Sequence, residues 1–166
     1  EQQVYLLGTG GKAVEMDETH LFTQKYHRGR QLKSEQTWVF GMIERETKKI
    51  FVQVIKKRDK FTLFDVVSIH LHKDAKLYGD SWKGYKKIEE VYDVSKVNHR
   101  KEFVSKDDNR IHTNNIERLW RSLKETMQGC QTDSYNARIS EFVYKRNFFS
   151  NNFYSNILIF LNHCTK

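Results

Sequence analysis

Three acidic residues have the chemical type and the positions that a metal-dependent phosphoryl-transfer site needs. Asp17 and Asp80 each end a segment with the pattern of a strand, and Glu117 lies in a segment with the pattern of a helix, with 36 residues between it and Asp80. Carboxylates hold Mg²⁺ or Mn²⁺, and two such ions about 4 Å apart activate an attacking oxygen and stabilise a leaving oxygen. The three residues are therefore candidate ligands of a two-metal site.

Each of these acidic residues also has a plainer structural interpretation. An aspartate at the end of a strand is commonly a turn former. Asn114 followed three residues later by Glu117 fits the capping-box pattern, in which the glutamate satisfies the start of its own helix. Glu18 is expected to be structural, because alternation along a strand turns its side chain to the opposite face from Asp17.

The segments that would position these residues alternate between strand and helix patterns. Strands are expected at residues 13–17, 38–43, 50–55, 75–80 and 91–97, with a hairpin joining the second and third. Helical patterns occupy residues 63–69, 82–86, 114–127, 139–143 and 156–161. This order predicts an α/β fold in which helices flank a mixed five-stranded sheet with ribonuclease H-like topology. If the first and fourth strands are neighbours and parallel, both aspartates emerge at the same sheet edge.

The helix expected after residue 113 has one apolar face and one polar face. Its apolar residues recur at helical spacing and are expected to pack inward: Ile116, Leu119, Trp120, Leu123 and Met127. Its polar stripe combines a carboxylate with two cations: Asn114, Glu117, Arg121 and Lys124. Gly129 is a suitable stop for this helix. The polar stripe is where this helix would meet a metal and a phosphate backbone.

The charge balance favours a polyanionic partner. Lys plus Arg outnumber Asp plus Glu by 29 to 21, which gives a formal net charge of +8 and a pI near 9.4. Nucleic acid is the first expectation and an anionic membrane surface the second. With 166 residues, 38% of them hydrophobic, the chain is expected to form one domain over residues 1–166.

Cysteine usage and hydropathy narrow the class further. Cys130 and Cys164 are far apart and have no C-x-x-C partner, so a reducing compartment is expected rather than a zinc finger or a disulfide framework. The longest apolar run, residues 157–161, is too short to span a bilayer, and the start lacks a secretory stretch. We therefore expect a protein that is neither secreted nor inserted in a membrane. The chain opens at Glu1, which suggests the core of a longer protein.

Several basic and histidine residues have both a functional and a plain interpretation. The stretch from Lys25 to Lys33 is either an ordinary solvated loop or a loop that contacts DNA phosphates, and its candidate contacts are Lys25, Arg28 and Arg30. The cluster at residues 56–58 is expected to be solvated. His99 and His112 either orient phosphate or water near the active helix, or satisfy turns.

Five strings, in order along the chain, resemble a known family. They are residues 14–19 (VEMDET), 38–41 (WVFG), 79–85 (GDSWKGY), 97–99 (VNH) and 112–120 (HTNNIERLW). Together they resemble the Merlin-type DDE transposases and the related bacterial ISXO-like insertion-sequence transposases. The resemblance extends from about Gly10 to Asn147.

The resemblance implies a ribonuclease H-like catalytic core that cuts and joins DNA at transposon ends. It implies Asp17, Asp80 and Glu117 as ligands of two Mg²⁺ or Mn²⁺ ions, with Lys124 and Arg121 close to the DNA. The implied partners are double-stranded DNA and further copies of the chain, since joining two ends favours a homodimer or a larger synaptic assembly. The implied location is the nucleus in a eukaryote, or the cytoplasm and nucleoid in a bacterium. The N-terminal DNA-recognition module of such transposases does not appear in these residues.

The chain departs from the family pattern at two positions. In addition, two asparagines are alternatives to Glu117 as the third metal ligand. Gly79 stands where relatives usually carry Thr or Ser, and Arg100 replaces a small hydroxyl residue. Some bacterial relatives use asparagine as the third catalytic residue, so Asn114 or Asn115 competes with Glu117, which we prefer because an anion offsets metal charge better. Two other functions stay open: an inactive, domesticated DNA-binding protein, and a nuclease that cuts without joining.

Overall fold

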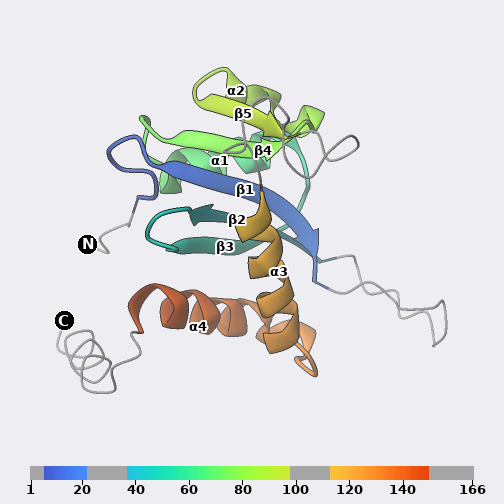
Figure 1. The fold of residues 1–166 in the computed structure, drawn as a ribbon. Helices are drawn as coiled ribbons and strands as arrows, with labels where there is room; N and C mark the ends of the chain where they lie inside the picture. The colour runs from blue at the N-terminus through green and yellow to red at the C-terminus, as the bar shows by residue number, and fades with distance from the viewer. Residues whose placement is uncertain (1–5, 22–36, 98–112, 150–166) are drawn as a thin grey trace.

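The computed structural model describes residues 6–21, 37–97 and 113–149, which contain five strands and four helices (Figure 1). The strands are β1 (Ala13–His20), β2 (Trp38–Glu44), β3 (Ile50–Ile55), β4 (Lys76–Asp80) and β5 (Asp93–Val97). The helices are α1 (Lys60–His70), α2 (Lys86–Glu89), α3 (Asn114–Thr126) and α4 (Tyr135–Phe148). Short 3₁₀ turns, η1 (Lys83–Tyr85) and η2 (Thr132–Ser134), lead into α2 and α4. In this part of the chain, no helix is long and apolar enough to cross a membrane.

The five strands form one mixed sheet in the order β3-β2-β1-β4-β5. The first three strands are antiparallel neighbours, whereas β4 runs parallel to both β1 and β5. The expected hairpin, the mixed sheet and the parallel pairing of the first and fourth strands are confirmed. Because β1 and β3 are both antiparallel to β2, they run in the same direction as each other and as β4 and β5. The carboxyl ends of β1, β3, β4 and β5 therefore meet at one edge of the sheet.

Helices cover both faces of the sheet, and each face has its own apolar core. One core includes α1, Tyr85 and Ile88 together with Val14 and Met16 of β1. The other lies under α3 and α4 and includes Val39 of β2, and Figure 1 shows α3 crossing the face of the sheet that is turned away from α1. Even-numbered β1 residues therefore meet α1, and odd-numbered ones meet α3.

The boundaries of β1 differ from the sequence expectation in a way that matters for the site. We expected Asp17 to end its strand, but β1 continues to His20, because its residues keep pairing with β2 as far as the His20–Trp38 pair. Pairing with β4, by contrast, covers only Ala13 to Glu15. Asp17 thus lies within β1, just beyond the point where the ladder to β4 ends.

Glu44 is a buried carboxylate that fixes the turn before β1. It accepts hydrogen bonds from the backbone N–H of Gly8 at 2.8 Å and the Thr47 hydroxyl at 2.8 Å, and Lys12 Nζ lies 3.2 Å away. Burial alone would raise the pKa of Glu44, but the bonds from Gly8, Thr47 and Lys12 outweigh it, and the pKa lies below its ordinary value of 4.5. The ionised form is therefore the one that the fold stabilises.

We expect Glu44→Gln to lower the free energy of unfolding by about 2 kcal/mol at pH 7, because charged hydrogen bonds to buried groups are lost. A pKa that is lower in the folded state stabilises the protein above the unfolded pKa, and this contribution disappears as the pH falls through the folded value. The difference in the free energy of unfolding between the variant and the parent chain should therefore become smaller below about pH 4.5. Urea unfolding from pH 3 to 8 measures it, with the exposed Glu46→Gln as control; a gap independent of pH would contradict the assignment.

Candidate active site

Asp17 and Asp80 occupy equivalent positions on neighbouring parallel strands. Glu15 of β1 pairs with Tyr78 of β4, and two residues further along each strand are Asp17 and Asp80. A step of two residues keeps a side chain on the same face of a sheet, so both carboxylates project on the α3 side at the carboxyl edge. The charges of both also act on Glu18. The fold thus brings these two sequence-predicted residues together.

Glu15 fastens the start of α3 to the strand that carries Asp17. Its fully buried carboxylate accepts hydrogen bonds from the backbone N–H groups of Asn115 at 2.9 Å and Ile116 at 3.0 Å. The Asn115 side chain donates to it at 2.7 Å, and Arg45 Nε lies 2.8 Å away. A carboxylate at a helix N-terminus satisfies unpaired N–H groups and complements the helix dipole. Glu15 therefore fixes where α3 crosses the sheet.

Trp120 of α3 reaches back to Asp17. Its indole Nε1–H donates to Asp17 Oδ2 at 2.9 Å, and the side chain is buried. Room for the ring comes from Gly41, which is the cross-strand partner of Asp17 on β2. A β-carbon built at Gly41 would overlap the Cη2 atom of Trp120. The indole is thus held in place over β2 with its N–H directed at one oxygen of the carboxylate.

Glu18 lies on the other side of the sheet from Asp17, as alternation predicts, and is buried. Burial raises its pKa to about 7; Arg58 opposes this shift, while the charges of Asp17 and Asp80 add to it. Arg58 Nη2 lies 3.4 Å from Glu18 Oε2, and its guanidinium stacks 4.0 Å from the Trp82 ring centroid. The expectation that Arg58 is simply solvated is therefore wrong, because its charge is used inside the fold.

Glu117 lies on α3, one turn before Trp120, and its side chain is exposed. The capping-box interpretation is wrong: Thr113 is the N-cap, Asn114 is the first helical residue, and Glu15 supplies the capping oxygens. The carboxylate of Glu15, and not the side chain of Asn114, therefore accepts from the first N–H groups of α3.

The two cations of the polar stripe lie further along α3. Arg121 is exposed, and Lys124 is half-buried near the end of β1. Burial lowers the pKa of His20, the last residue of β1, and the charges of Arg58 and Lys124 lower it further. Lys124 is thus close enough to act electrostatically on the strand that carries Asp17.

The structure describes the two asparagines that compete with Glu117, but it does not describe the other candidate residues. The Asn115 amide is occupied at both ends, since Nδ2 donates to Glu15 and Oδ1 accepts from Lys48 Nζ at 3.0 Å. Asn114 is half-buried at the start of α3. The other candidates lie outside the described residues, and their roles stay predictions: Lys25, Arg28, Arg30, His99 and His112.

Gly79, the departure beside Asp80, faces away from the site. A β-carbon at this position would lie 3.1 Å from Met16 Cε and 3.3 Å from Tyr85 Cε2, in the core under α1. The glycine therefore relieves crowding on the opposite face of β4 and leaves the carboxylate of Asp80, which accepts from the Trp82 backbone N–H at 2.9 Å, unaffected.

The chemistry of the aspartate pair suits a divalent cation. Carboxylate oxygens are the ligands that Mg²⁺ and Mn²⁺ prefer, and the two negative charges are close enough to raise the pKa of Glu18 on the far face. Within the described residues, however, no three His, Cys, Asp or Glu side chains form a group that would hold a metal ion. The fold thus brings Asp17 and Asp80 together, and within the described residues Glu117 does not join them in such a group.

Comparison with solved structures defines the class to which this fold belongs. The catalytic core domain of BIV integrase aligns with a TM-score of 0.56 and 17% identity, covering 94% of this chain and 98% of that one. The HTLV-2 integrase catalytic core domain in complex with magnesium gives 0.54 and 13%, covering 88% and 91%. The simian T-cell lymphotropic virus intasome in complex with PP2A regulatory subunit B56 gamma gives 0.55 and 11%, covering 90% and 51%. The fold is that of the ribonuclease H-like integrase cores.

The sequence itself gives the family. The family model for the ISXO2-like transposase domain matches residues 6–147. The chain therefore belongs to the ISXO2-like transposase domain family, as the five strings indicated. No curated protein matches the chain.

Proposed function

We propose that this chain is the catalytic core of a transposase, which cleaves DNA at the ends of a mobile element and joins the freed 3′ end to target DNA. The observation that carries the proposal is the pair of aspartates at equivalent positions of β1 and β4, in a chain of the ISXO2-like transposase domain family. Membership of the family supplies the reaction class, and the aspartate pair supplies a place for it.

Asp17 and Asp80 would hold divalent cations, with Glu117 as the third ligand. Bound there, two Mg²⁺ or Mn²⁺ ions would activate the attacking oxygen and stabilise the leaving 3′-oxygen. Glu117 is preferred to Asn115 because the Asn115 amide is already engaged by Glu15 and Lys48. The position of Glu117 one turn before Trp120, which contacts Asp17, also supports this choice.

The basic residues would hold DNA through its phosphates. Arg121 and Lys124 follow Glu117 on α3, and the acidic and basic groups together would bracket a phosphodiester. Lys25, Arg28 and Arg30 are proposed as further phosphate contacts, and His99 and His112 as supporting groups. Because two ends must be brought together, we propose a homodimer or larger assembly on double-stranded DNA.

Trp120 would act as a positioning residue for Asp17, which gives a prediction with two independent variants. Trp120→Phe removes the N–H but keeps a ring, and Gly41→Ala displaces the ring. Groups that orient a metal ligand typically contribute 10- to 100-fold in metal affinity. We expect both variants to weaken Mn²⁺ binding by about tenfold or more, measured by isothermal titration calorimetry. Unchanged affinity in Trp120→Phe would show that the indole serves packing alone.

The proposal is tested by scoring cutting and joining separately. The chain is incubated with a labelled duplex that carries a free 3′-hydroxyl and with a supercoiled plasmid, in Mg²⁺, Mn²⁺ or EDTA. Transfer of label to the plasmid in the presence of metal supports a transposase. Nicking without transfer would indicate a nuclease instead, and DNA binding without either reaction would indicate a DNA-binding protein that has lost catalysis.

A further inference from the structure

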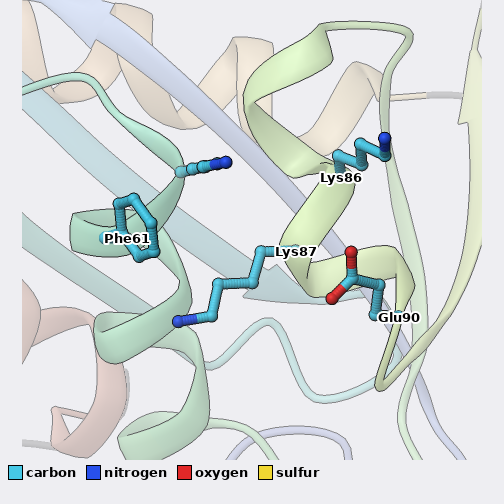
Figure 2. Close-up of a pocket in the computed structure, with 5 residues that line it drawn as sticks. Phe61, Lys86, Lys87 and Glu90 are labelled. Atoms are coloured by element: carbon cyan, nitrogen blue, oxygen red, sulfur yellow. The ribbon is translucent and has the colours of Figure 1, made fainter.

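A small basic pocket lies between α1 and α2. It has a volume of about 240 Å³ and is lined by Lys60, Phe61, Lys86, Lys87 and Glu90 (Figure 2). Figure 2 shows Lys87 extending from α2 toward Phe61 on α1, with Lys86 and Glu90 on the α2 side of the opening. Pockets for small organic ligands usually measure roughly 300–1,000 Å³ and are mostly apolar. This pocket is smaller and has three ammonium groups, which favours a single anionic group as its occupant.

Two of the three lysines in the pocket, Lys60 and Lys87, lie against aromatic rings. Lys87 Nζ lies 4.7 Å from the ring centroid of Phe61 and 4.3 Å from that of Phe64, and Lys60 Nζ lies 5.0 Å from Phe61. A ring face attracts an ammonium group but carries no net charge, so the three donors of each lysine can still bind an anion. Phe61 is 56% exposed, so this arrangement lies at the surface.

The pocket lies on the α1 face of the sheet, and the segments that form it begin beyond the carboxyl edge that carries the aspartates. Lys60 begins α1, five residues after the end of β3, and α2 begins six residues after Asp80 at the end of β4. β3 and β4 both end at the edge where Asp17 and Asp80 lie. Arg58, two residues before Lys60, is paired with Glu18, the chain neighbour of Asp17. The pocket lysines therefore lie on segments that leave this edge of the sheet, on the side away from α3.

We infer that this pocket binds a backbone phosphate of the DNA that is processed at Asp17 and Asp80. The inference rests on the proposed function, since it names a contact for the same DNA. A DNA strand held by Arg121 and Lys124 on one side and by the pocket on the other would cross the aspartates between two basic surfaces. Such contacts read the phosphates and not the bases, so the pocket would position DNA of any sequence.

Equilibrium binding of a labelled duplex in EDTA, measured by fluorescence anisotropy from 50 to 300 mM salt, tests the inference. Each lost phosphate contact reduces the slope of log affinity against log salt by about 0.9 and costs about eightfold at 0.1 M salt. We expect Lys86→Gln with Lys87→Gln to weaken binding at least about fivefold and to reduce this slope by about 1. Glu90→Gln, which removes the pocket's carboxylate, should strengthen binding, an effect that misfolding cannot produce.

The matched control is Lys73→Gln with Lys76→Gln, which removes the same charge from exposed lysines at the amino end of β4. An equal loss of affinity in this control, or an unchanged salt slope in the pocket variant, would overturn the inference. Because the binding assay is done in EDTA, without free metal ions, its result does not depend on cleavage. A chain that shows the pocket effect but neither cuts nor joins would contradict the proposed function alone. A chain that cuts and joins with an unchanged slope would contradict the pocket alone.

Discussion

Asp80→Asn is expected to abolish metal-dependent cutting and joining while leaving the fold and DNA binding intact. Asparagine keeps an oxygen that can accept the Trp82 backbone N–H, which Asp80 now accepts at 2.9 Å, so the turn after β4 is preserved. It removes one of the two negative charges that would hold the cations. A metal contributes several kcal/mol to the transition state of phosphoryl transfer, and about 4 kcal/mol corresponds to a thousandfold in rate. We therefore expect at least that loss in the plasmid-joining assay.

A matched change at the other end of the same strand controls for charge. Asp74 is exposed and precedes β4 at its amino end, so Asp74→Asn makes the same substitution far from the aspartate pair. It should leave joining within about twofold of the parent chain, as surface changes away from a site usually do. Asp17→Asn should match Asp80→Asn. Survival of cleavage in either site variant would show that the metal ligands have been assigned to the wrong residues.

The sheet was predictable because its signals are local. Two apolar runs around a charged turn indicate a hairpin, and β2 and β3 form one. The apolar stripe of α3 likewise repeats at helical spacing, and its residues are buried. The end of β1 was misplaced by three residues because pairing with β2, a long-range interaction, extends the strand beyond its apolar pattern. Local patterns identify elements, whereas tertiary pairing decides where they stop.

The candidate site was only partly predictable, for the same reason. Alternation placed Asp17 and Glu15 on one face, and parallel pairing brought Asp80 beside Asp17. The partners that orient these groups are 100 residues or more away in sequence: Glu15 caps α3, and Trp120 binds Asp17. A local pattern instead assigned the cap to Asn114. The one available signal was a glutamate at an inward-facing strand position, which is unusual unless it is paired.

Glu117 lies on a part of α3 whose backbone is tied to β1. The helix is fixed at its first turn by Glu15 and at its second by the Trp120–Asp17 hydrogen bond, and Glu117 lies between these two attachments. The backbone of Glu117 is therefore tied to β1, while its side chain is exposed.

Glu15→Gln is the change with the largest expected effect on stability. The substitution keeps the size of the side chain but removes the charge and turns an amide donor toward the donors of Asn115, Ile116 and Arg45. Breaking a buried pair by neutralising one partner typically costs 3–5 kcal/mol. For a chain of this length, 1 kcal/mol shifts the melting temperature by about 2–4 °C, so a decrease of about 10 °C is expected. Calorimetry measures it.

Hydrogen exchange separates the local effect of this change from a general loss of stability. The N–H groups of Asn115 and Ile116 lose their acceptor in the variant, so their exchange rates should rise relative to the parent chain. This rise should be larger than the rise at the N–H groups in the middle of β2. Glu125→Gln, at the exposed end of the same helix, should change neither the exchange nor the melting temperature. If the Glu15→Gln variant had the same melting temperature as the Glu125→Gln variant, the buried carboxylate of Glu15 would not be what holds α3. The placement of Trp120 beside Asp17 would then need another cause.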